Sequence, residues 1–393
     1  MSNMLRLLTV LLMIPTFTAC STPTLHGVRP AVQTTIDAGG IAGAVTVVVT
    51  RDRVVHLDTA GFADLARRKP MRTDTVFYIA SMTKPVTAAA VLMLQDEGKL
   101  NVSDPVSKFI PEFAALKTPS GRPANLTIAR LLTHTSGLGE APLEQVWQAH
   151  TLANAIPLYL AAPMQYEPGE KWKYTQSGIN VAARIVEVAG GMTFDEFVQK
   201  SIFDPLGMKS TTFYAMEKFP GRLAVSYTKN ASNGVLEVNT PDAGFGTHQR
   251  PPLGNGGLFS TGPDYARFCQ MLLGKGMFRG KRLLSPEAFK LMSTIQTGDI
   301  PTGFFQSKEF GNHGTSYGWG IGTCILRAPH EGVAAMLSPG SFGHGGAWGT
   351  QAWVDPVRGI AYVLMVQRTN FPNSDASDIR RDFQQAASDA LAK

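Results

Sequence analysis

The stretch Val76-Phe77-Tyr78-Ile79-Ala80-Ser81-Met82-Thr83-Lys84-Pro85 joins an apolar strand to an alanine-rich helix. A serine and a lysine three residues apart lie on one helical face, with about 5–6 Å between their Cβ atoms. Because proline fits a first helical turn but breaks a helix interior, the helix is predicted to begin close to Ser81. The unpaired N–H groups of that turn would stabilise an oxyanion beside Ser81. The stretch predicts an activated serine, although a serine before a helix is more often an N-cap.

The composition is that of a globular protein. The chain has 393 residues, of which 44% are hydrophobic and 17% charged, enough for a large core and about two or three domains. The net charge is +6, but no long basic run is present, so no nucleic-acid partner is expected. No metal-ligand cluster is visible, and neither a metal nor a cofactor is expected. Cys269 and Cys324 lie in apolar stretches and are predicted to be buried free thiols, with a disulfide between them as the alternative.

Residues 1–20 are predicted to be a secretory signal. A basic start and the apolar run 7–14 precede Phe17-Thr18-Ala19-Cys20, and the apolar run is too short to remain as a membrane-spanning helix. The ending resembles a bacterial lipoprotein signal, in which the cysteine becomes the lipidated N-terminus. We therefore expect export to the cell envelope, a lipid anchor at Cys20 facing the periplasm, and a tether over residues 21–27. Ordinary cleavage after Ala19 is the alternative.

Hydrophobic periodicity predicts an α+β fold. Strands are expected at 41–50, 54–62, 75–79, 317–326, 341–354 and 360–367. Helices are expected at 86–97, 128–133, 179–189, 194–202, 264–273 and 375–391. These positions predict an antiparallel sheet built from both ends of the chain, flanked by terminal helices, with an all-helical lobe inserted. We assign 28–80 and 255–393 to the α/β lobe and 81–254 to the helical lobe, with the active site in a cleft between them.

Further motifs follow the Ser-x-x-Lys stretch in a characteristic order. They are Leu131-Leu132-Thr133-His134-Thr135-Ser136-Gly137-Leu138, Tyr174-Thr175-Gln176-Ser177, Asp204-Pro205-Leu206-Gly207-Met208, Gly256-Gly257-Leu258-Phe259-Ser260-Thr261 and Gly343-His344-Gly345-Gly346-Ala347-Trp348-Gly349. Together they resemble the serine β-lactamase and penicillin-binding-protein superfamily. The closest branch is the class C β-lactamase-like proteins, which include the family VIII carboxylesterases. The resemblance covers nearly the whole chain after the signal.

The resemblance implies roles for individual residues. Ser81 would be acylated, Lys84 would act as base alone or with Tyr174, and Tyr174 would protonate the leaving group. The oxyanion hole would consist of the backbone N–H groups of Ser81 and Ala347. Substrate-binding positions would be Gln176, His344, Gly346 and Trp348.

Two positions depart from the penicillin-recognising enzymes. Gln176 replaces the asparagine of Tyr-x-Asn, and His344 replaces the lysine of Lys-Thr-Gly. A histidine with a pKa near ~6.5 is mostly neutral at pH 7, so the fixed positive charge is lost. This substitution disfavours an efficient β-lactamase and favours esters or weakly charged substrates.

The sequence therefore predicts an exported serine hydrolase that forms an acyl-enzyme on Ser81. Its expected partner is a small ester or amide, and short-chain carboxylic esters are the favoured substrates. A D-amino-acid peptidase or weak β-lactamase of the cell envelope is the first alternative. A catalytically silent wall-binding protein is an alternative of another class.

A second serine motif, Gly314-Thr315-Ser316-Tyr317-Gly318, matches the Gly-x-Ser-x-Gly pattern of α/β-hydrolases. That pattern requires a strand before the serine and a helix after it. A strand-like run follows Ser316 instead, so Ser316 is not predicted to be a nucleophile. His134, in the Thr-His-Thr-Ser-Gly segment, is predicted to be a loop anchor rather than a base.

Overall fold

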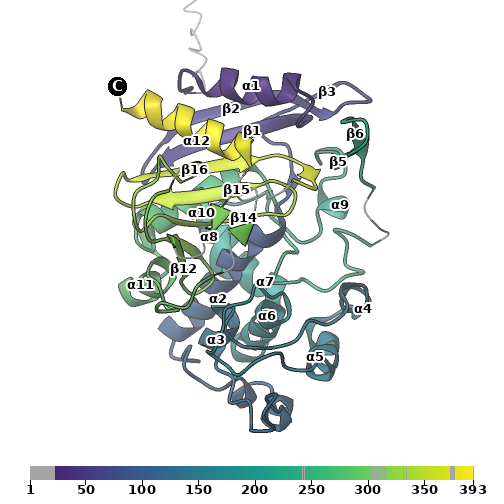
Figure 1. Ribbon diagram of the computed structural model, residues 1–393, viewed down its shortest axis with the longest axis vertical. Coiled ribbons are helices and arrows are strands. Elements are labelled where there is room, and N and C mark those ends of the chain that lie inside the picture. The colour runs from purple at the N-terminus through teal and green to yellow at the C-terminus, as the bar shows by residue number, and fades with distance from the viewer. Residues whose placement is uncertain are drawn as a thin grey trace, which may run out of the picture.

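An eight-stranded antiparallel sheet and a group of helices make up the two halves of the molecule (Figure 1). The computed structural model describes residues 23–392 apart from 241, 243, 303–305, 308–310, 313–315, 331, 333 and 372–376. The predicted signal and its Cys20 lie outside the described residues.

The sheet is built from both ends of the chain, as predicted. In spatial order its strands are β12 (Tyr317–Trp319), β13 (Cys324–Leu326), β14 (Phe342–Gly345), β15 (Gln351–Asp355), β16 (Ile360–Met365), β1 (Gly43–Thr50), β2 (Val54–Asp64) and β3 (Lys69–Pro70). Every neighbouring pair is antiparallel. Because β1 pairs with β16 on one side and β2 on the other, N-terminal and C-terminal strands meet in the middle of the sheet.

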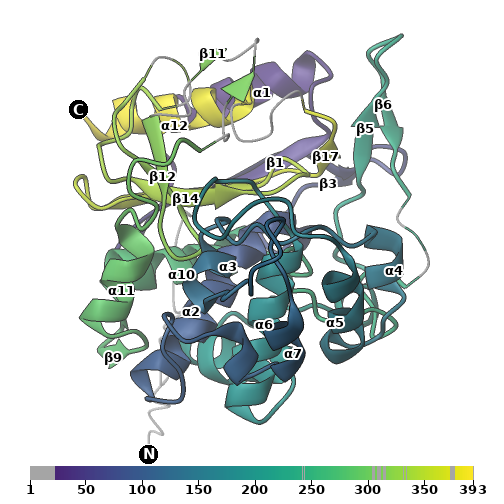
Figure 2. The same cartoon turned by 60° about the horizontal axis from the view of Figure 1, so that its bottom comes forward.

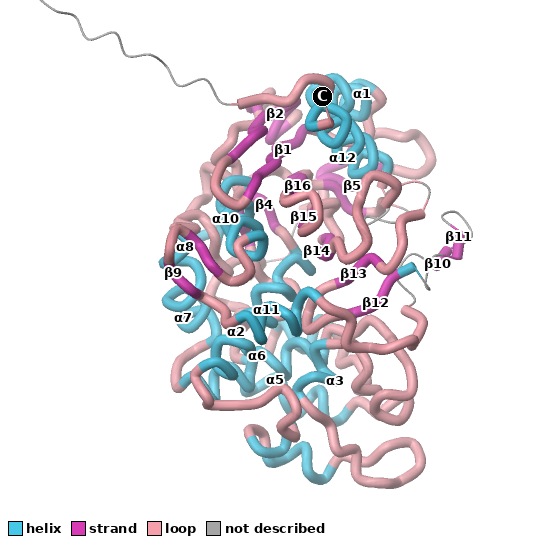
Figure 3. The backbone as a smooth tube through the Cα atoms, turned by 90° about the vertical axis from the view of Figure 1, so that its left-hand side faces the viewer, coloured by secondary structure: helices cyan, strands magenta, loops and turns pink. Residues whose placement is uncertain are grey.

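Both faces of the sheet are covered by helices. Helices α1 (Val28–Asp37) and α12 (Asp378–Leu391) lie side by side on one face, and α10 (Gly262–Leu273) packs on the other (Figures 1 and 3). Val48 of β1 belongs to the core under α1 and α12, while Val47 belongs to the core under α10. Burial on both faces explains why β1 is an almost unbroken apolar run.

One glycine allows α10 to lie close to the sheet. A Cβ at Gly262 would approach Val47 Cγ2 to 2.9 Å and Val45 Cγ1 to 3.0 Å, closer than side-chain carbons normally pack. A larger residue at this first position of α10 would push the helix away from β1.

The second half of the molecule is helical and surrounds α2 (Thr83–Asp96), whose first twelve residues are all buried. Its other helices are α3 (Ile128–Leu132), α4 (Leu143–Trp147), α5 (Leu152–Ala161), α6 (Ser177–Gly190), α7 (Phe194–Val198), the π-helix Gln199–Phe203, α8 (Asp204–Leu206) and α9 (Ala215–Lys218), with α11 (Pro286–Ser293) beside α2. Short 3-10 helices occur at Ala80–Met82, Val106–Lys108 and Pro111–Ala115. Figure 2 shows this half gathered below the sheet.

Three predicted strands differ in the structure. The strand expected at 75–79 is the short β4 (Phe77–Tyr78), which pairs with β7 (Phe259–Ser260) outside the main sheet. The runs expected at 317–326 and 341–354 are hairpins, because glycine-containing turns at 320–323 and 346–350 interrupt them. A run of apolar residues does not by itself reveal such a turn.

The remaining strands form small sheets. They are β17 (Arg368–Thr369) with β5 (Tyr227–Lys229) and β6 (Leu236–Val238), β8 (Met277–Phe278) with β9 (Lys281–Arg282), and β10 (Gln306–Ser307) with β11 (Gly311–Asn312). The predicted fold class, a β-lactamase-like α+β fold with a large antiparallel sheet and terminal helices, is confirmed. The lobe boundaries assigned from the sequence remain predictions.

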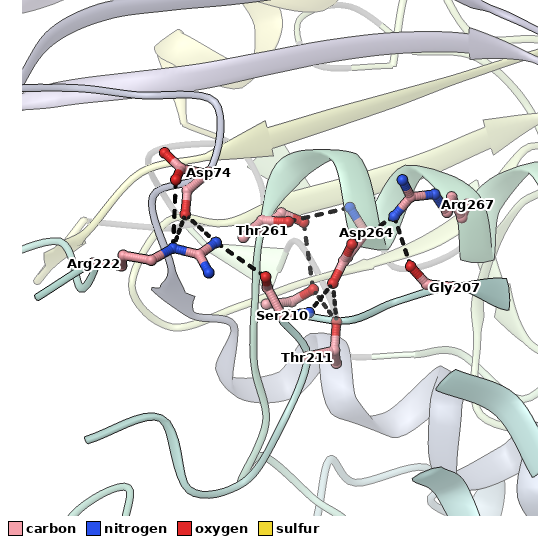
Figure 4. Close-up of polar contacts among 9 residues, drawn as sticks. Asp74, Gly207, Ser210, Thr211, Arg222, Thr261, Asp264 and Arg267 are labelled. Atoms are coloured by element: carbon pink, nitrogen blue, oxygen red, sulfur yellow. Dashed lines mark hydrogen bonds and ion pairs between the residues drawn. The ribbon is translucent and has the colours of Figure 1, made fainter. Parts of the chain in front are cut away.

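A buried carboxylate fixes the segment after α8 to α10. Asp264 Oδ2 accepts the Ser210 N–H at 2.6 Å and the Thr211 hydroxyl at 3.2 Å. Arg222 donates to the Ser210 hydroxyl and to the Asp74 carbonyl, which precedes β4 (Figure 4). Burial raises the pKa of Asp264, and the Ser210 N–H, the Arg267 guanidinium and the Thr211 hydroxyl oppose the rise. The network ties four separate parts of the chain beside the strand that leads to Ser81.

The two cysteines lie in different cores. Cys269 on α10 packs on one face of the sheet, and Cys324 on β13 packs on the other. Both are buried, as the sequence predicted. Among the described residues, no helix combines the length and apolar character needed to cross a membrane.

A buried histidine fixes the start of the described chain to the sheet. His56 of β2 accepts the Leu25 N–H at Nδ1 (2.9 Å), and its Nε2 lies 2.8 Å from Thr46 Oγ1. Since Nδ1 is an acceptor, Nε2 carries the proton and donates to Thr46. Burial lowers the pKa of His56 to about 4, the carboxylate of Asp58 opposes this effect, and Arg29 adds to it.

This depressed pKa predicts a pH dependence of stability. A base whose pKa is lower in the folded state stabilises the fold fully above the unfolded pKa of ~6.5, and the contribution disappears as the pH falls through about 4. The loss amounts to about 3 kcal/mol. We expect the free energy of unfolding of the wild type to fall by that much more than that of His56→Gln between these pH values, measured by urea denaturation. Equal losses in the two proteins would contradict the assignment.

Candidate active site

Ser81 lies at a sharp turn between β4 and α2, in the 3-10 helix Ala80–Met82. Ala80 has a φ of 44°, and a non-glycine residue in such a conformation costs about 1–3 kcal/mol and is typical of functional sites. The N-cap position of α2 is occupied by Met82, not by Ser81. The half-buried serine is therefore not a helix cap, and its hydroxyl is available for another task.

Lys84 brings a buried amino group to this hydroxyl. Its Nζ lies 3.0 Å from Ser81 Oγ, 2.9 Å from Gln176 Oε1 and 2.7 Å from the carbonyl oxygen of Asn255. The amide and carbonyl oxygens only accept hydrogen bonds, whereas a serine hydroxyl both donates and accepts. When the amine is neutral and donates to the other two oxygens, its lone pair is left for the proton of Ser81. The arrangement can remove the proton from the serine.

Tyr174 lies over Lys84 on the other side. The Nζ of Lys84 is 4.6 Å from the centre of the phenol ring, and the phenol oxygen is 3.4 Å from His344 Nε2. His344 Nδ1 lies 2.7 Å from the Gly345 carbonyl oxygen, so Nδ1 carries the proton and Nε2 accepts from Tyr174. The three side chains with predicted catalytic roles are thus brought together, with His344 next to the phenol.

His344 is buried behind Tyr174, with 2% of its surface exposed. Burial, together with the nearby Lys84 amine, lowers the pKa of His344 to about 3, and the bond to Gly345 opposes the effect. The imidazole is therefore neutral at pH 7, as the sequence predicted on other grounds. The substrate contact predicted for His344 remains a prediction; the side chain has Tyr174 as its partner in the structure.

Gln176 contacts the amine rather than open solvent. Its Oε1 accepts from both Lys84 Nζ and Asn255 Nδ2, each at 2.9 Å. Glu140 fixes the backbone here, since its carboxylate accepts the N–H groups of Gln176 and Ser177 and the Ser177 hydroxyl. A carboxylate is favourable at this point because α6 begins at Ser177.

The predicted oxyanion hole involves the end of β14. A Cβ at Gly346 would approach the Ile79 carbonyl oxygen to 2.5 Å, so only glycine lets this turn lie against the segment before Ser81. Ala347 follows at an exposed position, and its predicted role stays a prediction. Trp348 comes next, with its ring 4.8 Å from that of Tyr78 and its Nε1 donating to Ser226 Oγ.

His134 supports Tyr174, in agreement with its predicted anchoring role. It is fully buried, its Nδ1 accepts the Thr175 N–H at 3.2 Å, and its ring lies 4.6 Å from that of Tyr174. Burial lowers its pKa, and so do Lys84 and His344. The imidazole fixes the backbone directly after the phenol.

Sequence reasoning missed two residues, Glu140 and Asn255. Asn255 directly precedes the Gly256-Gly257 motif, and this adjacency was its only signal. Glu140 follows the Thr-His-Thr-Ser-Gly motif, and no residue spacing links it to Gln176, 36 positions later.

Ser316 is not placed like a nucleophile. It directly precedes strand β12, and its carbonyl accepts the Arg327 N–H. The helix that must follow the serine of an α/β-hydrolase is replaced by a strand. The predicted strand after Ser316 is confirmed, and the interpretation that Ser316 is not the nucleophile remains a prediction.

The fold and the serine–lysine pair define a serine hydrolase. A family model described as Beta-lactamase matches residues 28–387. The chain belongs to this family.

Three similar proteins illustrate the range of the family. Esterase EstB of Burkholderia gladioli is 29% identical over 83% of this chain and 86% of its own length. A putative D-alanyl-D-alanine carboxypeptidase of Escherichia coli O157:H7 is 27% identical over 86% of this chain and 81% of its own. The solved structure of EstCE1, a hydrolase with promiscuous acyltransferase activity, superposes with a TM-score of 0.76 at 24% identity, covering 92% of this chain and 97% of EstCE1. The similarity to EstCE1 shows that the two proteins share a fold.

The low pKa of His344 predicts that this residue adds no inflection to the pH profile of kcat/KM near neutral pH. Because the imidazole titrates at about 3, it stays neutral from about pH 5 to 8. His344→Gln retains an acceptor for Tyr174, so we expect kcat/KM to fall by about tenfold or less while the shape of its pH profile is unchanged. If an inflection near neutral pH disappeared in the variant, His344 would be a titrating group and this interpretation would be wrong.

Proposed function

We propose that this serine hydrolase is a carboxylesterase that acts on carboxylic esters through an acyl-enzyme on Ser81. The observation that supports it most is the 3.0 Å separation between Lys84 Nζ and Ser81 Oγ, with Gln176 Oε1 and the Asn255 carbonyl oxygen as the other neighbours of the amine. This geometry suits proton removal from a serine that is a poor nucleophile on its own.

In the acylation step, Ser81 Oγ attacks the ester carbonyl carbon and its proton passes to neutral Lys84. The carbonyl oxygen becomes an oxyanion, which the backbone N–H groups of Ser81 and Ala347 would bind. The intermediate then collapses, the carbon–oxygen bond to the alcohol breaks, and the alcohol oxygen takes a proton from Tyr174. Lys84 returns its proton to Tyr174, so both groups regain their starting states.

Deacylation follows the same steps with water in place of Ser81 as the nucleophile. Water attacks the acyl carbon and gives its proton through Tyr174 to Lys84. The bond to Ser81 Oγ breaks, and the serine recovers that proton, which releases the carboxylic acid. Proton transfer of this kind contributes about 10²–10⁴-fold, and each oxyanion donor about 3 kcal/mol.

Esters are favoured over β-lactams because the third motif lacks a fixed charge. The neutral, buried His344 offers no cation for the carboxylate of a penicillin or a peptide. The esterase relative EstB is compatible with this substrate class. The carboxypeptidase relatives keep a D-amino-acid peptidase as the second candidate, with a weak β-lactamase as a variant of it. A silent wall-binding protein would not need the intact cluster of Ser81, Lys84 and Tyr174.

We also propose that the protein acts in the bacterial cell envelope, exported by residues 1–20 and anchored through lipidated Cys20. The support for this proposal is the charged start, apolar run and cysteine ending of that segment.

The nucleophile is tested by two serine substitutions. We expect Ser81→Ala to lower hydrolysis of 4-nitrophenyl butyrate by at least about 10³-fold, because no acyl-enzyme can form. Ser316→Ala serves as the matched control and should retain near-normal activity. The reverse pattern would end the assignment of Ser81, and a clear preference of the wild type for nitrocefin would overturn the substrate class.

The base is tested by Lys84→Met, which keeps the apolar stem in its buried site. We expect the acylation rate in a stopped-flow burst to fall by about 10²-fold or more, because Ser81 then lacks a proton acceptor. Circular dichroism and thermal unfolding verify that the variant is folded. A burst rate equal to that of the wild type would show that Lys84 is not the base.

A further inference from the structure

A large cavity lies beside the segments that carry Ser81 and Ala347. It has a volume of about 530 Å³ and is lined on one side by Tyr78 and Trp348. Tyr78 precedes Ser81 by three residues, and Trp348 directly follows Ala347, the predicted oxyanion donor. The wall nearest the chemistry is therefore carried by the same segments as the nucleophile and the oxyanion hole.

Aromatic and other apolar side chains dominate the lining. The ring of Tyr78 lies 4.7 Å from Phe245, 5.1 Å from Phe259 and 4.8 Å from Trp348. Further walls come from α4, α9 and β6, which lie along one side of the molecule (Figure 1). We call this cavity the aromatic pocket.

The pocket is much larger than a short acyl chain requires. Cavities of about 300–1,000 Å³ enclose drug-sized ligands, with apolar walls for affinity and a few polar groups for orientation. An acetyl or butyryl group would leave most of the aromatic wall in contact with water. A ring-containing group would bury that wall, and burial of apolar surface is the main source of binding free energy.

One cation in the wall is arranged to bind an anion. The guanidinium of Arg250 lies 4.2 Å from the ring centre of Trp147 and 2.8 Å from Asp242. The Arg250 side chain is only 13% exposed, whereas that of Asp242 is 62% exposed. Within the described part of the chain the guanidinium donates to Asp242 alone, which leaves most of its five N–H donors available.

The charge of the lining also favours an anion. Three cationic side chains, Arg67, Lys69 and Arg250, face the pocket with two acidic ones, Asp64 and Asp242. Asp64 is paired with Arg67 and Asp242 with Arg250 itself, so Lys69 supplies the one positive charge in excess and the lining as a whole is cationic. Electrostatic complementarity would select a negatively charged substrate here.

The pocket suits the acyl part of the ester. The leaving alcohol must lie beside its proton donor, and neither Lys84 nor Tyr174 lines the pocket. The part of the ester that extends into the pocket is then the acyl group, which stays attached to Ser81 after the alcohol has left.

We propose that the aromatic pocket binds a bulky, ring-containing acyl group that carries a carboxylate or a similar anionic group, paired with Arg250. This proposal rests on the esterase function above and replaces the short-chain substrate class with aryl or alicyclic acids bearing a second acidic group. Arg250 is a specificity-determining residue in this scheme.

The test compares two esters of closely similar shape in the purified protein: the mono-4-nitrophenyl ester of 1,4-phenylenediacetic acid, and its neutral amide counterpart, 4-nitrophenyl 4-(carbamoylmethyl)phenylacetate. We expect the wild type to prefer the anionic ester in kcat/KM by at least about tenfold, and both over 4-nitrophenyl acetate. Arg250→Met should reduce the ratio between the anionic and neutral esters by about tenfold or more. Met216→Trp, which fills the pocket from α9, should lower kcat/KM for both bulky esters relative to kcat/KM for 4-nitrophenyl acetate.

Two variants serve as matched controls. Arg279→Met removes a different arginine that also lies over an aromatic ring, that of Phe278, outside the pocket. Val188→Trp adds a tryptophan at a separate surface groove of the helical half. Both should keep the wild-type ratios. An unchanged ratio in Arg250→Met, or a wild type that prefers acetate, would overturn the proposal.

Failure of the pocket proposal is distinguishable from failure of the esterase proposal. If Ser81→Ala abolishes acetate hydrolysis while bulky esters are not favoured, only the pocket proposal is wrong. If no ester is hydrolysed, the esterase proposal fails, and binding of 1,4-phenylenediacetate is measured by tryptophan fluorescence. Wild-type affinity about tenfold or more above that of Arg250→Met would support the pocket, and equal affinities would refute it.

Discussion

Lys84 carries an amino group into the interior of the protein, and the site is organised around the need to surround it with oxygen atoms. A buried charge or polar group is costly unless it is hydrogen-bonded. Here three oxygens come from the 3-10 helix before α2, from the residue before α6 and from the segment before β7. Satisfying one nitrogen therefore fixes three separate parts of the chain relative to each other, and Ser81 is placed as a consequence.

The two histidines near this amine are kept neutral by burial and by the amine itself. His134 and His344 both have lowered pKa values, and Lys84 is the second cause in each case. Neutral imidazoles can hold Tyr174 and the backbone after it without competing for protons. Arg250, the proposed anion-binding residue, lines the aromatic pocket and is paired with Asp242.

The framework that supports the site was largely predictable, because each of its parts is coded by neighbouring residues. The apolar run of β1, the periodicity of α10 and α12, and the proline after Lys84 all depend on local pattern. The hairpins β12–β13 and β14–β15 were each predicted as one strand, since apolar residues continue up to both sides of their turns. Strand β4 was assigned to the wrong sheet, because its pairing partner lies far away in the chain: Tyr78 and Phe259 are 181 residues apart, and no local pattern indicates that they pair.

The sequence by itself determined that a serine and a lysine share one helical turn. Residues three apart lie on the same face of a helix, and a proline favours the first turn, so both signals are local and need no tertiary contact. The sequence also determined that the apolar run 41–50 forms a strand, and the structure then showed that this strand is buried on both faces. Only the tertiary structure decided which oxygens complete the shell of Lys84, that Glu140 holds the start of α6, and that Tyr78, Phe245 and Trp348 enclose one cavity. These contacts join segments far apart in the chain, where packing rather than periodicity selects the neighbours.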